Sequence, residues 1–164
     1  MLTQEIIKEN FRYDPDTGDF FWIKQNYGKR NLKNAISSKN SKGYIQVCTN
    51  LSGSKKIYDV HRLIWIYVYG EIKNQIDHIN GIRHDNRLCN LREATHQQNM
   101  MNRKKTSKKN KFKGIYSSKN KKRWIAEICF KGQRKYLGIF DTQEEAGQAY
   151  EKAAKENFKE FART

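Results

Sequence analysis

The stretch DHINGIRHDNRLCNLREATHQQN, residues 77–99, decides the fold that this sequence predicts, because its local signals change three times. Its first residues complete NQIDHING, which is typical of a strand that ends in an Asn-Gly hairpin turn at 80–81. A second turn cluster, HDN, follows at 84–86. Thr95, with a glutamine three residues later, forms a capping box that marks the start of a helix. The stretch is therefore predicted to run from a strand through a turn-rich loop into a helix.

Polar side chains of this stretch have the chemistry that phosphodiester hydrolysis requires. The reaction needs an activated water molecule, and a divalent cation can neutralise the phosphate and stabilise the leaving oxygen. Asp77 and Asn99 offer side-chain oxygens, which are the ligands that magnesium prefers. His78 follows Asp77, so on a strand it points to the opposite face. An ordinary His pKa of about 6.5 suits a general base, so the pattern is typical of a metal-dependent nuclease site.

The same residues, DHING…DNRLCNLREATHQQN, resemble the HNH (ββα-metal) nucleases, in the branch of phage and intron-encoded homing endonucleases. The resemblance covers residues 58–103 and includes HRLIWIYVYGEI, which is a helix in that branch, although propensity alone does not separate strand from helix here. It implies that Asp77 and Asn99 bind one divalent cation, magnesium or manganese. It also implies that His78 is the general base and that Asn90 braces the loop that holds this base.

Residues 112–164 predict a second unit, in which three short alternating strands, FKGIYSS, KRWIAEICF and QRKYLGIF, precede a helix. Thr142 and Glu145 form a capping box at the start of that helix. One face of that helix is expected to carry Ala146, Ala149, Tyr150, Ala153 and Asn157. The alanines of this face are expected to let it approach the sheet closely. Alternate residues of the middle strand are expected to cover this helix: Trp124, Ala126, Ile128 and Phe130.

The segment KGIYSSKNKKRWIAEICFKGQRKYLGIFDTQEEAGQAYEKAAKE resembles the APETALA2/ethylene-response-factor DNA-binding domain, over residues 112–158. In that family the sheet face away from the helix enters the major groove of DNA. The resemblance implies five DNA-contacting candidates: Lys113, Tyr116, Arg123, Arg134 and Tyr136. Several arginines that read guanines in the plant proteins are replaced here, by Tyr116, Ser118 and Cys129, so the plant recognition sequence does not carry over. Arg87 is a further candidate, either for a phosphate contact or as a support of its own loop.

The first 57 residues are expected to be rich in β structure. A turn, DPDTG, precedes three predicted strands, at 19–24, 43–49 and 55–60. Two segments, YDPDTGDFFW and GYIQV, resemble the region upstream of the nuclease in the phage proteins, which implies contact with DNA. Residues 104–111 carry like charges without an apolar anchor, which predicts a basic linker.

The charge of the chain favours a nucleic-acid partner. Its 164 residues include 33 Lys and Arg against 17 Asp and Glu, a formal net charge of +16, and such a field attracts polyanions. No apolar run approaches the ~20 residues of a membrane span, and the N-terminus lacks the regions of a signal peptide. The three cysteines show no CxxC pairing. We therefore expect a cytoplasmic protein of a bacterial or phage-infected cell.

These observations together predict an α+β protein with a β-rich DNA-contacting region, a ββα-metal nuclease core, a basic linker, and a three-stranded antiparallel sheet packed on one helix. The four segments are 1–57, 58–103, 104–111 and 112–164. The predicted function is site-specific cleavage of double-stranded DNA by a homing-type endonuclease, which nicks as a monomer or cuts both strands as a homodimer. Two alternatives stay open: a DNA-binding regulator with an inert HNH fold, and a nuclease that acts on RNA.

Overall fold

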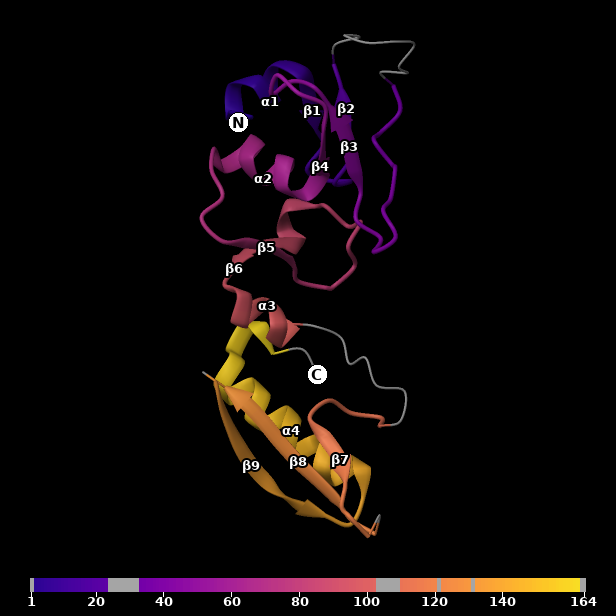
Figure 1. Ribbon diagram of the computed structural model, residues 1–164, viewed down its shortest axis with the longest axis vertical. Helices are drawn as coiled ribbons and strands as arrows, with labels where there is room; N and C mark the ends of the chain where they lie inside the picture. The colour runs from indigo at the N-terminus through magenta and orange to yellow at the C-terminus, as the bar shows by residue number, and fades with distance from the viewer. Residues whose placement is uncertain (1, 24–32, 103–109, 121, 131, 163–164) are drawn as a thin grey trace. The chain divides into compact units, whose positions relative to one another are not determined.

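The computed structural model of the chain shows an α+β fold built from small antiparallel sheets and short helices, which confirms the predicted fold class (Figure 1). It describes residues 2–23, 33–102, 110–120, 122–130 and 132–162. Two compact units result, unit 1 at Met1–Thr95 and unit 2 at His96–Thr164, and each is described by itself. Most of the predicted linker 104–111 lies outside the described residues. The predicted domain boundaries stay predictions.

The described residues of unit 1 form three two-stranded antiparallel sheets and two α-helices. Its elements are α1 (Gln4–Asn10), β1 (Phe11–Tyr13), β2 (Phe20–Trp22), β3 (Gln46–Thr49), β4 (Lys56–Asp59), α2 (Val60–Tyr69), β5 (Gln75–His78), the 3₁₀ turn η1 (Leu88–Asn90) and β6 (Leu91–Ala94). The sheets pair β1 with β2, β3 with β4, and β5 with β6. Helix α1 is a departure from the predicted β-rich region, and the hydroxyl of Thr3 accepts a hydrogen bond from the Ile6 amide at its start.

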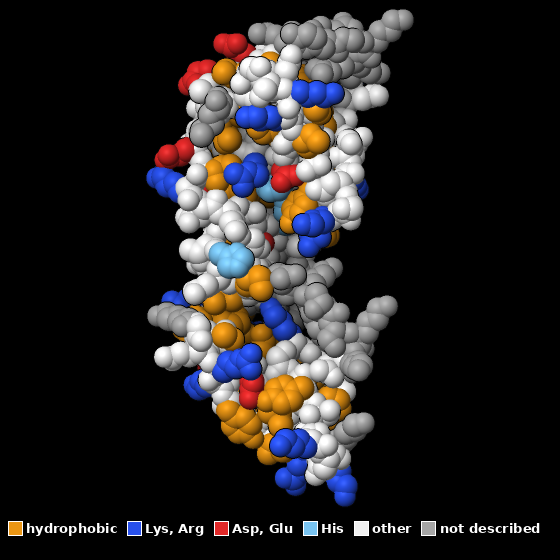
Figure 2. Space-filling model, in the orientation of Figure 1, with side chains coloured by type: hydrophobic (Ala, Val, Ile, Leu, Met, Phe, Trp, Pro, Cys, Tyr) orange, Lys and Arg blue, Asp and Glu red, His pale blue; other side chains and the backbone are white. Residues whose placement is uncertain are grey.

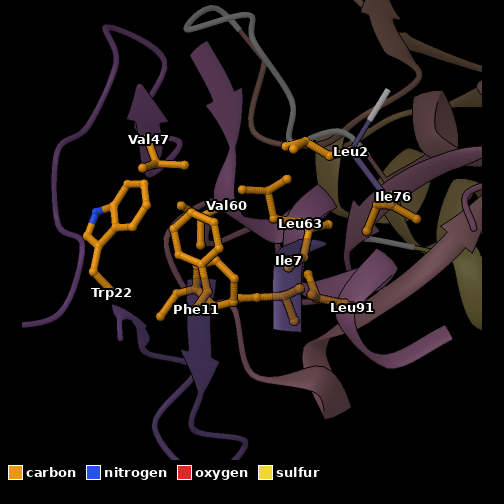
Figure 3. Packing of buried hydrophobic residues seen from close by; sticks show 11 residues of the cluster. Leu2, Ile7, Phe11, Trp22, Val47, Val60, Leu63, Ile76 and Leu91 are labelled. Atoms are coloured by element: carbon orange, nitrogen blue, oxygen red, sulfur yellow. The ribbon is translucent and has the colours of Figure 1, made fainter. Parts of the chain in front are cut away.

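Burial decides the ambiguous segment at 60–69 in favour of a helix. Leu63 and Ile64 of α2 are almost completely buried, and they join a cluster that includes Ile7 of α1. Gly70 ends the helix with a φ of 88°, a left-handed conformation that glycine adopts easily. Leu91 of β6 belongs to the same cluster, close to Ile7 in Figure 3. The hairpin of β5 and β6 is therefore anchored to the helical core of unit 1.

Unit 2 begins with helix α3 and ends with a sheet backed by a long helix. Its elements are α3 (His96–Asn102), β7 (Ile115–Ser117), β8 (Trp124–Phe130), β9 (Gln133–Phe140), α4 (Gln143–Phe158) and the 3₁₀ turn η2 (Lys159–Phe161). The strand order is β7-β8-β9, antiparallel throughout. The predicted capping box of α4 is present, with the hydroxyl of Thr142 accepting from the Glu145 amide.

The inner faces of β8 and α4 agree with the predicted pattern. Ala126 and Ile128 of β8 are buried, as is Ala146 of α4. Of the predicted helix face, Ala149 and Asn157 are only half-buried, whereas Gly147, Ala154 and Phe158 complete the buried side. A Cβ at Gly147 would lie 2.5 Å from the ring of Phe112, so this glycine permits a close approach. Within the described residues, none of the helices is long and apolar enough to cross a membrane.

Candidate active site

The two adjacent candidate residues of strand β5, Asp77 and His78, have different neighbours. Both are buried, with exposed fractions of 7% and 3%. In the pairing with β6, Asp77 lies opposite Arg92 and His78 lies opposite Leu91. Because successive strand residues point to opposite faces, one short strand presents a carboxylate on one side and an imidazole on the other, as predicted.

Asp77 forms an ion pair with its cross-strand neighbour. Both Nε and Nη2 of Arg92 donate to Oδ2 of Asp77, at 3.1 and 3.0 Å. The side chains are only 8% and 13% exposed, so water screens the pair weakly. A buried charge needs such a partner, because removing an ion from water costs several kcal/mol. The guanidinium therefore holds the Asp77 side chain at a fixed place on the strand.

His78 makes a side-chain hydrogen bond with Asn86, from the loop between β5 and β6. Nε2 of His78 lies 3.1 Å from Oδ1 of Asn86. Burial lowers the pKa of His78 below its ordinary value, and the hydrogen bond to Asn86 opposes part of this effect. The imidazole is thus neutral at neutral pH, which is the form that can accept a proton from water.

Aromatic rings pack against His78. The ring of His61, from α2, lies edge-on to it with centroids 4.9 Å apart, and the ring of Tyr44 lies 5.8 Å away. The guanidinium of Arg83 lies over Tyr44, at 5.2 Å from the ring centroid. Burial, together with the neighbouring His78, lowers the pKa of His61 to about 3, so His61 is neutral. The imidazole of the candidate base therefore packs against the rings of His61 and Tyr44.

Asn90 ties together the two ends of the loop that carries Asn86. Its side chain donates to the carbonyl oxygen of Asp85 at 2.7 Å and accepts from the amide of Asn80 at 2.9 Å. The side chain of Asn80 in turn donates to Oδ2 of Asp85 at 2.7 Å. These contacts are of the kind that the predicted bracing role of Asn90 requires, and they support that role.

Arg87 stabilises the same loop through an ion pair with Asp85. Its Nε and Nη2 donate to the two carboxylate oxygens of Asp85, at 2.8 and 2.7 Å. This fork, with smaller help from Asn80, lowers the pKa of Asp85 to about 2. Of the two functions considered for Arg87, loop support agrees with this geometry. The side chain is still 47% exposed, so a phosphate contact stays a prediction.

Known proteins are similar to this chain in its central part and beyond it. Residues 58–101 match the HNH endonuclease family. The chain is also 35% identical over 119 residues to an uncharacterized HNH endonuclease, L560, of Acanthamoeba polyphaga mimivirus. That alignment covers 68% of this chain and 62% of the relative, less than two thirds of its length.

A solved structure of the HNH homing endonuclease I-HmuI, described as showing DNA binding and cleavage, is similar to 85% of this chain. The similarity covers 76% of that protein, with 22% sequence identity and a TM-score of 0.45. The HNH segment, defined here as residues 58–101, contains all four residues of the predicted metal and catalytic set: Asp77, His78, Asn90 and Asn99.

The chemistry of the HNH segment fits a hard divalent cation. Asp77 supplies a carboxylate oxygen, and Asn99 would supply an amide oxygen, both suited to magnesium or manganese. Asn99 lies on α3 and is half-buried. Because α3 belongs to unit 2 and Asp77 to unit 1, a shared ion stays a prediction. The part of the chain that the structure describes contains no group of three His, Cys, Asp or Glu side chains that could hold a metal.

The predicted DNA-contacting residues of unit 2 divide into two groups. By strand register, Tyr116, Arg134 and Tyr136 share the sheet face away from α4. In Figure 2, apolar side chains lie beside Lys and Arg over this sheet. Arg123 precedes β8 and pairs with Asp141 at 3.0 Å, between exposed side chains. Lys113 instead donates to the carbonyl oxygen of Met101, at 2.6 Å, which holds it near α3.

Among the described residues that contact the candidate pair, four are not in the predicted set of site residues: Arg92, Asn86, Tyr44 and His61. Asn86 sits in the HDN cluster, where turn propensity is sufficient to explain an asparagine. The contact of Arg92 with Asp77 can be predicted only when the register of β5 and β6 is known, and the irregular loop between the strands hides this register in the sequence. His61 comes from a helix, and no local pattern relates it to His78.

Replacing Arg92 tests the buried ion pair. Arg92→Met should lower the free energy of unfolding by about 3–5 kcal/mol, because the Asp77 carboxylate would stay buried without its guanidinium. The control is Lys73→Met, which breaks the exposed pair of Lys73 and Glu71 and should cost at most about 1 kcal/mol. Urea unfolding measures both values. Equal and small losses would contradict the structural importance of the Asp77 pair.

Proposed function

We propose that this protein is a metal-dependent HNH endonuclease of the homing type that hydrolyses double-stranded DNA. One observation carries the proposal: a short strand places a buried neutral imidazole beside a buried carboxylate, within the HNH segment. A structural histidine and aspartate would not need an adjacent turn-rich loop braced by Asn90. The net charge of +16 supports a polyanionic substrate.

His78 is the proposed general base and takes the proton from the attacking water. The ion held by Asp77 and Asn99 would neutralise the scissile phosphate and stabilise the leaving oxygen. Arg92 holds the Asp77 carboxylate in position through their ion pair. Asn90 and Arg87 keep the loop of the base rigid, so that the imidazole does not need to reorganise during the reaction. The resemblance implies products with 5′-phosphate and 3′-hydroxyl ends.

Unit 2 is the proposed recognition module. Tyr116, Arg134 and Tyr136 present a flat, partly aromatic face that suits the major groove of DNA. The hydroxyl of Tyr116 donates to a Glu127 carboxylate oxygen at 2.6 Å, and Arg123 is engaged with Asp141, so these two would have to exchange partners on DNA. Arg134 is therefore the first choice for a direct contact. One active site per chain means that a monomer would nick, whereas a pair of chains would cut both strands.

Replacing the base tests the catalytic proposal. His78→Ala should lower the rate of DNA cleavage by roughly a hundredfold or more, since a positioned general base contributes ~10²–10⁴. The affinity for DNA should change little. The matched control is His84→Ala, which removes an exposed histidine of the same loop region and should leave the rate nearly unchanged. Cleavage at the original rate by His78→Ala would remove the proposed role.

Replacing Arg134 tests the recognition proposal. If the guanidinium contacts a guanine, Arg134→Ala should relax preference at one base position, by about 1–3 kcal/mol. If it contacts a phosphate, the affinity should fall alike for all sequences, and the salt slope should decrease by about 1. The control is Lys152→Ala, an exposed cation on α4. Binding titrations of target and scrambled duplexes at several salt concentrations distinguish the two kinds of contact. Equal affinities and equal sequence preferences for both variants would exclude the sheet face as the DNA-binding surface.

A further inference from the structure

Asn86 is the most deeply buried polar residue near the candidate base. It is 1% exposed, and the bracing hydrogen bonds described above join Asn80, Asp85 and Asn90 to one another without its side chain. Its Oδ1 lies 3.1 Å from Nε2 of His78, whereas its Nδ2 has no hydrogen-bond partner among the described residues. A buried polar group without a partner is destabilising. A residue that serves packing alone would not need an amide in this place.

The hydrogen bond determines which nitrogen of His78 can act as a base. A neutral imidazole has one N–H donor and one nitrogen with a free lone pair. With its amide oxygen toward the ring, Asn86 can only accept, so this contact favours the tautomer with the proton on Nε2. The lone pair is then on Nδ1, which is the nitrogen that can take a proton from water. Without the acceptor at position 86, the tautomer with the proton on Nε2 would lose the hydrogen bond that favours it.

The backbone of Asn86 is held by the hairpin of β1 and β2. The hydroxyl of Tyr13 donates to the carbonyl oxygen of Asn86 at 3.0 Å. Burial raises the pKa of Tyr13 to about 12, so the hydroxyl keeps its proton. Gly18, in the turn of the hairpin, has a φ of 80°, and a Cβ there would lie 2.8 Å from the carbonyl carbon of Asn86. The hairpin and the loop thus pack backbone against backbone.

We propose that Asn86 is a positioning residue for His78, which selects the tautomer with the proton on Nε2, and that the β1–β2 hairpin holds Asn86 in place through Tyr13. The inference rests on the proposed function, since it assigns the reactive nitrogen of that base. It gives the N-terminal hairpin a role in organising the active site, in addition to any contact with DNA. Asn86 acts through His78 and does not touch the substrate.

Nitrogen NMR of the full chain tests the tautomer directly, because protonated and unprotonated imidazole nitrogens have well-separated shifts. At a pH well above the ordinary His pKa, His78 should show a proton on Nε2. Asn86→Leu should remove this preference, whereas Asn86→Asp keeps an acceptor and should retain it. DNA cleavage should fall at least roughly tenfold in Asn86→Leu, as when a partner that orients an active-site imidazole is lost, and should be restored in part by Asn86→Asp.

Tyr13→Phe gives a second test that does not disturb the loop interior. It removes one hydroxyl and should reduce both the tautomer preference and the cleavage rate. The matched control is Tyr58→Phe, whose hydroxyl donates to Ser52 at 2.8 Å elsewhere in unit 1 and should change neither. If Asn86→Leu does not fold, the tautomer and the cleavage rate measured on Tyr13→Phe test the inference in its place.

A proton on Nδ1 in the unmodified protein, or an unchanged tautomer and rate in the folded variants, would overturn the inference. If the unmodified protein does not cleave DNA, the proposed function fails, while the tautomer measurement still tests the role of Asn86.

Discussion

The two-residue period of strand β5 is the constraint on which the candidate site depends. It sends Asp77 and His78 to opposite faces although both are buried, so each polar group needs its own partner. Arg92 of β6 supplies one partner through an ion pair, and Asn86 of the loop supplies the other through a hydrogen bond. A shift of one residue in the β5–β6 register would exchange the faces and separate both pairs. The hydrophobic contacts that anchor the hairpin therefore also keep Asp77 and His78 beside their polar partners.

Several features could be predicted from the sequence because a local signal specifies them. The capping box at Thr142 marks the start of α4, and the alternation in β8 identifies Ala126 and Ile128 as the inner face. The adjacent pair Asp77 and His78 could be assigned to opposite faces once a strand was predicted there. In each case the deciding interaction lies within a few residues along the chain, or follows from strand geometry alone.

Other features depend on contacts between distant segments and could not be predicted in this way. Tyr13 and Asn86 are 73 residues apart, and no local pattern relates them. His61 reaches His78 from a helix that propensity did not separate from a strand; packing against the core decided the outcome. Helix α1 is only seven residues long, and such a short helix is stabilised mainly by tertiary contacts, here with α2. The candidate catalytic residues were thus predictable, whereas the groups that position them were not.

Withdrawal of divalent cations tests the central claim, a hydrolytic site with a metal-binding carboxylate, most directly. The account predicts that EDTA abolishes DNA cleavage by the purified protein and that magnesium or manganese restores it. Asp77→Ala should not be restored, whereas Asp16→Ala, which removes an exposed carboxylate of the first hairpin turn, should behave like the unmodified protein. Full cleavage in EDTA, or cleavage by Asp77→Ala at the original rate once the ion is added, would contradict the claim of a metal-binding carboxylate at Asp77.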